Sequence, residues 1–138
     1  MRVLFLLAFS CLFTPAFAQL EKTLHQTFEV KEVKNISVNI PAGYELLSWP
    51  GDVILVETNV KLEQANAAIM NYVVENGRYL IQFEGKKDGN YILSYKNPSP
   101  QKLKTKFGIC DEVVNIRIFV PESFDISDKA QVRRTHDN

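Results

Sequence analysis

The sequence contains 138 residues, of which 46% are hydrophobic, and it carries 16 basic and 16 acidic side chains. This length and apolar content suit one domain with a core of its own. A net charge of zero gives the chain as a whole no electrostatic preference for nucleic acid, which binds to a basic stripe, so we expect no nucleic-acid partner.

The first 18 residues, MRVLFLLAFSCLFTPAFA, have the anatomy of a signal peptide. Arg2 supplies the positive start, an apolar run follows, and Ala16 to Ala18 form a small-x-small cleavage site. The apolar run is shorter than the ~20 residues that span a bilayer. We therefore expect cleavage after Ala18, export to the periplasm or the extracellular space, and no transmembrane segment in the mature chain.

Cys11 lies in this leader, where an outer-membrane lipoprotein would carry its acylated cysteine. Phe9, however, stands where such a signal needs a small residue, so lipidation is the less favoured alternative. Cleavage leaves Cys110 as the one remaining cysteine, which excludes an internal disulfide. We expect Cys110 to be a small buried residue and not a nucleophile, because His25 and His136 lie near the chain ends.

Alternation of apolar and polar residues predicts the first strands. Residues 19–27 show no clear period and are expected to form a polar entry segment. From Phe28 onward the period is two, with breaks at the Pro- and Gly-containing positions 41–43 and 50–51. The longest run covers 54–62, where alternate positions are apolar or threonine, so one face packs and the other contacts water.

Residues 63–75 change to a helical period, because apolar side chains recur every three or four residues, at Ala65, Ala68, Ile69, Tyr72 and Val73. Glu63 is placed near the start, where a negative charge favours the helix dipole. Asn76 and Gly77 supply a C-terminal cap. The pattern predicts one amphipathic helix of about three turns, packed against a sheet.

Strands return after the helix. Residues 79–83 and 91–95 alternate around a glycine-bounded turn at 85–89, which predicts a hairpin. A further alternating run covers 114–120 and ends at Pro121.

Residues 127–138 are polar apart from an isolated Val132, so we expect a disordered tail. The organisation predicted is a single domain over 28–126, mainly β with antiparallel strands. It would be a β-sandwich or a β-solenoid cap with one amphipathic α-helix.

The sequence offers little for catalysis. It has no G-x-S-x-G, no H-x-x-x-H and no paired-cysteine motif, so we expect no catalytic residue, no metal and no cofactor. Carboxylates near strand ends could be imagined as a glycosidase pair, but such residues are usually solvated; they are Glu84, Asp88, Asp111 and Glu112. A small glycan hydrolase is therefore a remote alternative.

Aromatic side chains are the first candidates for a binding surface. Most of them, including Tyr79, Tyr91 and Tyr95, are expected to cover the sheet core. Trp49, beside a Pro-Gly turn, is the exception that we favour, with Tyr44 as its neighbour on the same predicted strand.

A basic edge is the second candidate surface. It consists of two parts: the pair Lys86 and Lys87, and the segment in which Lys102, Lys104 and Lys106 alternate. These lysines either guard an edge strand against unwanted pairing, the alternative that we favour, or contact an anionic envelope polymer.

The order of these segments resembles the start of the autotransporter-adhesin "head GIN" family, which is related to the toast-rack domains of bacterial envelope proteins. The matching residues are Phe28, Val30, Val33, Ile36 and Val38, then Gly77, Leu80 and Gln82, then Val114, Ile116, Ile118, Val120 and Pro121. Gln82 departs from the apolar residue of the family pattern. Family members continue into a β-solenoid, so the resemblance implies that this chain corresponds to the opening cap of that architecture.

The hypothesis is an exported, non-enzymatic domain of the bacterial envelope that acts as an adhesin-like binding module. Its expected partner is an envelope protein or a polysaccharide. The alternative is a structural or envelope-stress signalling module similar to toast-rack domains.

Overall fold

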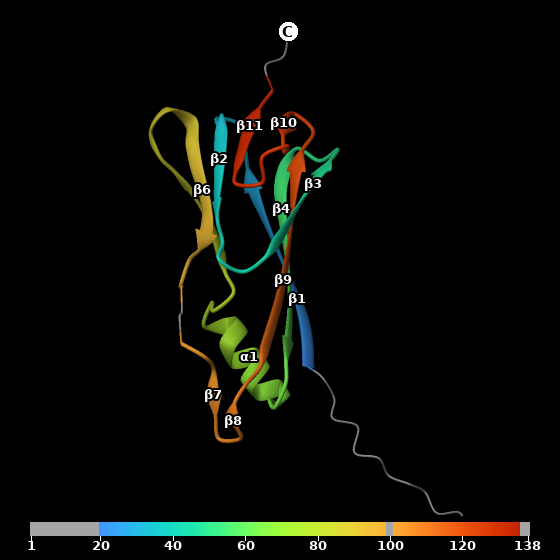
Figure 1. Ribbon diagram of the computed structural model, residues 1–138, viewed down its shortest axis with the longest axis vertical. Helices are drawn as coiled ribbons and strands as arrows, with labels where there is room; N and C mark the ends of the chain where they lie inside the picture. The colour runs from blue at the N-terminus through green and yellow to red at the C-terminus, as the bar shows by residue number, and fades with distance from the viewer. Residues whose placement is uncertain (1–19, 99–100, 136–138) are drawn as a thin grey trace, which may run out of the picture.

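The structure is a computed structural model that describes residues 20–98 and 101–135. The predicted signal peptide lies outside these residues. The chain forms, in order, β1 (Leu20–Glu29), β2 (Asn35–Asn39), β3 (Tyr44–Trp49), β4 (Val53–Leu62), α1 (Ala67–Glu75), β5 (Ile81–Gly85), the 3-10 turn η1 (Lys87–Gly89), β6 (Asn90–Tyr95), β7 (Lys104–Thr105), β8 (Gly108–Ile109), β9 (Glu112–Pro121), β10 (Phe124–Asp125) and β11 (Gln131–Arg134) (Figure 1).

The strands form two main sheets and one small hairpin. Sheet A has the order β1-β4-β9-β3, sheet B has the order β10-β11-β2-β6-β5, and β7 pairs with β8. The mainly β class with a single helix is confirmed. Strand direction is mixed, however, because β3 runs parallel to β9 and β2 runs parallel to β6, whereas the other pairs are antiparallel as expected.

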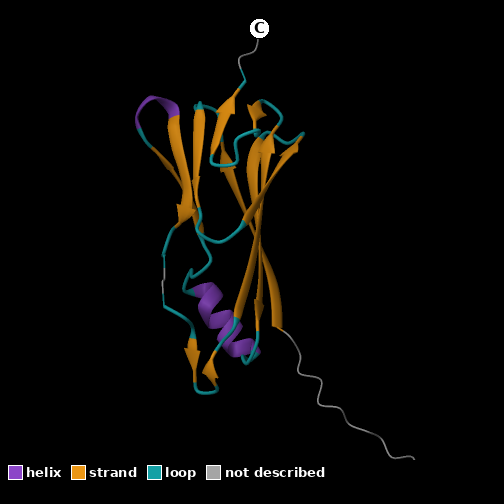
Figure 2. Cartoon of the chain, in the orientation of Figure 1, coloured by secondary structure: helices purple, strands orange, loops and turns teal. Residues whose placement is uncertain are grey.

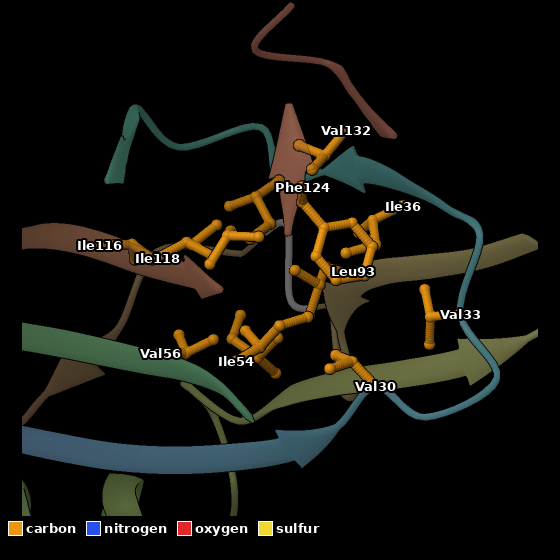
Figure 3. Close-up of a cluster of buried hydrophobic side chains, with 13 residues drawn as sticks. Val30, Val33, Ile36, Ile54, Val56, Leu93, Ile116, Ile118, Phe124 and Val132 are labelled. Carbon is orange, nitrogen blue, oxygen red and sulfur yellow. The ribbon is translucent and has the colours of Figure 1, made fainter. Parts of the chain in front are cut away.

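The larger core lies between the two sheets. Alternation sends one face of every long strand inward: in β4, Ile54 and Val56 are almost fully buried, and in β9 so is Ile118. Figure 3 shows these side chains opposite Ile36 and Leu93, which come from sheet B. The alternating pattern in the sequence therefore located most of this core.

A second core lies under the helix. β1, β4 and β9 have ten residues each, whereas β2, β5 and β6 have five or six, so sheet A extends beyond sheet B. Helix α1 covers this extension (Figure 2), with Met70 and Val73 packed against Val60 and Leu62 of β4. The helix thus occupies the place that sheet B leaves open.

The helix is confirmed, but it begins at Ala67 and not at residue 63. Asn66 is its N-cap, because the Asn66 side chain accepts a hydrogen bond of 2.9 Å from the Ile69 amide. Glu63 therefore lies before the helix. At the other end Gly77 has φ +73°, which matches the predicted C-terminal cap.

Two segments expected to be irregular are strands. Residues 20–27 of the predicted polar entry segment form most of β1, with alternate side chains half-buried from Leu20 onward. Its pattern was missed because polar residues such as Lys22 and Gln26 occupy inward positions. The predicted disordered tail contains β11, which pairs with both β2 and β10 and buries Val132 to 1% exposure.

Candidate functional site

The outer face of sheet B contains an open hollow of about 530 Å³, which we call the amide hollow. Three neighbouring strands and the turn before β6 form it. Its lining residues are Asn35, Ser37, Lys86, Asn90, Tyr91, Ile92, Gln131 and Arg133.

Strand register brings the polar groups of this hollow together. β2 and β6 run in parallel with Asn35 opposite Asn90, and the Asn35 Nδ2 donates to Asn90 Oδ1 at 2.9 Å. β11 places Gln131 opposite Ser37, and the Gln131 Nε2 donates to Ser37 Oγ at 3.2 Å. These side chains point outward because Ile36, their neighbour on β2, points into the core.

Charges at the rim of the hollow are close to balance. Lys86 Nζ lies 2.7 Å from Glu84 Oε1, and both side chains are about half exposed. Arg133 lies opposite Asp125 across the β10–β11 pair. The Ser127 amide donates a hydrogen bond that holds the pKa of Asp125 below its usual value, so this carboxylate is ionised. The hollow therefore offers hydrogen-bonding groups more than a net charge.

A second polar cluster lies where α1 meets β9. Arg78 Nε lies 2.6 Å from Glu112 Oε1, and the Arg78 Nη2 donates to the other carboxylate oxygen at 2.9 Å. The Tyr79 hydroxyl donates to Glu112 Oε1 at 2.7 Å. Tyr95 and Val114 complete the lining of a small pocket of about 160 Å³.

This cluster keeps Glu112 ionised. Burial raises the pKa of Glu112, but the hydrogen bonds from Arg78 and Tyr79 outweigh burial, so the pKa lies below its ordinary value. Burial also raises the pKa of Tyr79, which stays a neutral donor. A carboxylate held in this way is poorly suited to donate a proton as a general acid. The cluster fits a structural link between the helix end and β9.

The remaining carboxylates singled out in the sequence are dispersed. Glu84 is paired with Lys86 on β5, and Asp88 lies in the turn before β6 with φ +62°. Asp111 lies in the loop between β8 and β9, where its carbonyl accepts from the Glu63 amide. Within the described ranges, no three His, Cys, Asp or Glu side chains are grouped so that they could hold a metal ion.

Cys110 is buried to 3% exposure, as expected, and its thiol donates to the Glu63 carbonyl at 2.9 Å. Burial raises the pKa of the Cys110 thiol, which disfavours the reactive thiolate. His25 points to the outer face of sheet A, where its Nε2 lies 3.1 Å from Glu57. The two residues therefore do not form a nucleophile–base pair.

Trp49 and Tyr44 lie on the same strand but on opposite faces of it. The Trp49 indole donates to the Val53 carbonyl at 2.9 Å, and its ring lies 6.0 Å from the Phe119 ring on the outer face of sheet A. Tyr44 packs against the core between the sheets, and its hydroxyl donates to the Lys129 carbonyl at 2.8 Å. Both side chains are half-buried, so they do not form one shared surface.

The predicted basic edge is divided in the structure: Lys86 and Lys87 lie in the turn before β6, whereas Lys102, Lys104 and Lys106 lie at the other end of the molecule. Lys102 precedes the β7–β8 hairpin, which lies below α1 in Figure 1; Lys104 is the first residue of β7 and Lys106 lies at the turn. All three are exposed. The structure thus separates these three lysines from both aromatic residues.

Sequence reasoning did not find the residues of the amide hollow. The sequence pattern does indicate that Asn35 and Ser37 face outward, since they are the polar members of an alternating strand. The sequence pattern did not indicate Gln131 and Arg133, because their strand lies in the segment expected to be disordered.

No helix in the described ranges has the length and apolar character needed to cross a membrane.

Comparison of the chain with known protein families, curated proteins and solved structures finds no match.

Proposed function

We propose that this chain is an exported binding module of the bacterial cell envelope that holds a polysaccharide in the amide hollow, without catalysing a reaction on it. The observation that carries this proposal is the set of amide and hydroxyl side chains aligned across three strands, from Asn35, Ser37, Asn90 and Gln131.

The chemistry of these groups suits a sugar chain. Amides both donate and accept hydrogen bonds, as sugar hydroxyls do. Ile92 adds an apolar side chain to the lining of the hollow, against which the C–H face of a sugar ring can pack. Because the groups stand on paired strands, little conformational entropy is lost when a ligand binds.

Two features of the sequence support the location and the role. The leader anatomy of residues 1–18 supports export. The resemblance to the adhesin family supports a surface or periplasmic binding role. The near balance of charge around the hollow favours a neutral polysaccharide over a strongly acidic one.

The experiment is affinity electrophoresis of the exported protein in gels that contain soluble envelope polysaccharide, together with co-sedimentation with isolated peptidoglycan sacculi. The double variant Asn35→Ala, Gln131→Ala is expected to bind the retaining polymer roughly thirtyfold more weakly, since each of the two lost hydrogen bonds costs about 1 kcal/mol. The matched control is Asn59→Ala on the outer face of sheet A, where Asn59 bonds to Glu21 and Thr23. Unchanged retention of the double variant on every polymer contradicts the proposal.

A second candidate function is pairing with another envelope protein, as a structural or signalling module. It is supported by β3, which is a terminal strand of sheet A that pairs only with β9 within the described residues. Such an edge can accept a strand from a partner. A photo-crosslinker at the exposed Ser48 of β3, compared with one at Asn59, tests this alternative: one discrete product specific to Ser48 supports it, and equal labelling contradicts it.

A further inference from the structure

The β7–β8 hairpin lies at one end of the molecule, and β2, β6 and β11, whose residues line the amide hollow, lie toward the other end (Figure 1). Its turn is compact: the Phe107 amide donates to Thr105 Oγ1 at 3.1 Å, and Thr105 Oγ1 donates to the Gly108 carbonyl at 3.3 Å. Gly108 has φ +110°, a conformation that glycine adopts readily. The tip is therefore a defined turn.

The base of the hairpin is fixed to the protein. The Cys110 amide donates to the Leu103 carbonyl at 2.8 Å, and the Cys110 thiol bonds to the loop before α1. Leu103 packs against the core under the helix, a cluster that includes Met70 and Val73. The hairpin is thus held in one orientation relative to the rest of the domain.

The tip exposes two large apolar side chains. Phe107 is 57% exposed and Ile109 is 49% exposed, although both are apolar. Burial of such side chains is favourable, so their exposure on a projecting turn calls for a partner that covers them.

Three lysines lie in the same segment as these apolar groups, and Lys104 is opposite Ile109 in the β7–β8 pair. Lys102, Lys104 and Lys106 are exposed, and Lys106 Nζ lies 5.1 Å from the centre of the Phe107 ring. The segment from Lys102 to Ile109 contains no acidic residue. Asp111 and Glu63 are the nearest carboxylates along the attached loops, and they lie at the base of the hairpin.

We propose that the β7–β8 hairpin docks the protein on an anionic phospholipid bilayer. Phe107 and Ile109 enter the boundary between head groups and acyl chains, while the lysine ammonium groups remain among the phosphates. The charges of the lysines complement those of the lipid head groups. A fluid bilayer can accept a convex apolar tip, whereas a folded protein would need a matching cavity.

This site is separate from the amide hollow, and the inference does not rest on the proposed function. If both hold, the domain can contact a membrane at one end and an envelope polysaccharide at the other. A failure at one site leaves the test of the other unchanged.

The experiment is flotation of the exported protein with two kinds of vesicle. One is phosphatidylcholine with roughly 30% phosphatidylglycerol, an anionic fraction that gives the surface a negative potential for polybasic binding. The other is phosphatidylcholine alone. Mass spectrometry confirms that all variants share the same N-terminus, so that the leader does not differ between samples. The variants are a lysine triple, Lys102→Gln, Lys104→Gln, Lys106→Gln, and an apolar double, Phe107→Ser, Ile109→Ser. Circular dichroism checks their folding.

We expect binding to the anionic vesicles, with roughly a hundredfold loss in the lysine triple, at about fivefold per lysine. The apolar double should lose at least about tenfold. The matched control triple, Lys31→Gln, Lys87→Gln, Lys129→Gln, removes the same charge at exposed positions outside the β7–β8 hairpin, between β1 and β2, in η1 and between β10 and β11. It should bind within about twofold of wild type. The variant Phe107→Trp should gain fluorescence that brominated lipid quenches, whereas Trp49 emission should not be quenched.

Three results would overturn the proposal. The first is equal loss in the control triple, which would indicate unspecific attraction of the whole protein. The second is binding that depends on the lysines but survives in the apolar double, which would assign the hairpin to an acidic polymer or protein. The third is an absence of binding by the wild-type protein to the anionic vesicles.

Discussion

The side-chain amide of Gln26 forms two hydrogen bonds with the main chain of Ile81. The Gln26 Nε2 donates to the Ile81 carbonyl at 2.9 Å, and the Ile81 amide donates to the Gln26 Oε1 at 3.0 Å. Gln26 belongs to β1, the edge of sheet A, and Ile81 belongs to β5, the edge of sheet B. The amide therefore takes the place of a neighbouring strand and joins the two sheets at this seam.

Replacement of Gln26 tests this link. Gln26→Leu keeps the approximate shape but leaves the amide and carbonyl of the buried Ile81 without their partner, so we expect a loss of about 2 kcal/mol in the free energy of unfolding. Urea denaturation measures the loss, and hydrogen exchange should show a faster Ile81 amide. Thr27→Val, on the exposed face of the same strand, is the control. Wild-type stability in Gln26→Leu would show that water can satisfy Ile81.

The ion pair between Arg78 and Glu112 predicts a pH dependence. The pKa of Glu112 in the folded protein lies below the ordinary value of 4.5, so its stabilising contribution is present above that value. The contribution is lost as the pH falls through the lowered pKa.

Glu112→Gln should cost about 2 kcal/mol at pH 7, and the difference from wild type should shrink as the pH is lowered toward 3. Urea denaturation at a series of pH values measures this difference. The control is Glu75→Gln at the exposed end of α1, which should differ from wild type by less than about 0.5 kcal/mol. A difference for Glu112→Gln that stays constant down to pH 3 argues against the ion pair.

Val132 tests whether the C-terminal strand contributes to the core. Its side chain is 1% exposed among residues of both sheets, so Val132→Ala should destabilise the protein by about 2 kcal/mol through two lost methyl groups and the resulting cavity. Lys129→Ala, an exposed residue just before the strand, should be close to neutral. Thermal unfolding compares the two. Equal stability of both variants would show that this segment does not contribute to the core.

Gly77 and Gly43 form a matched pair of glycines. Gly77 has φ +73°, and a Cβ there would lie 2.9 Å from the Asn97 Nδ2 and 3.0 Å from Leu80 Cδ1. Gly77→Ala should therefore cost about 1 to 2 kcal/mol. Gly43 has no neighbour within 4 Å of such a Cβ and no positive φ, so Gly43→Ala should be neutral or slightly stabilising. Chemical denaturation that ranks the two variants in the reverse order contradicts this account of the helix end.

Trp49 is predicted to stabilise the fold and to be dispensable for binding. Its ring covers Gly51 so closely that a Cβ there would lie 2.3 Å from Trp49 Cζ2, and its indole bonds to Val53. Trp49→Ala should lower stability by about 2 kcal/mol and leave polysaccharide retention unchanged. Tyr72→Ala, at a 66% exposed aromatic residue, serves as the control for stability. Reduced retention at full stability would instead place Trp49 in the binding surface.

Several elements of the fold could be predicted from the sequence because their signals are local. The inward side chains of β4 follow from strict alternation over ten residues, and the end of α1 follows from Asn76 and Gly77. Burial of Cys110 follows from its apolar surroundings and the absence of a disulfide partner. An apolar residue at every second position indicates a strand, and a glycine after a helical pattern indicates the end of a helix, without knowledge of any other segment.

The candidate site could not be predicted, because it depends on which strands become neighbours. Asn35 and Gln131 are 96 positions apart, and they share a hollow only because β11 pairs with β2. The parallel direction of β2 and β6 is likewise a property of the pair and not of either strand.

The sequence by itself thus determined a mainly β domain with one helix, since periodicity records which side of each element faces the core. The tertiary structure alone decided the order of the strands, the bond between Gln26 and Ile81, and the placement of β11. Each of these depends on hydrogen bonds between main-chain groups and partners far apart in the sequence. Every residue type offers nearly the same main-chain groups, so the local sequence does not indicate which of them pair.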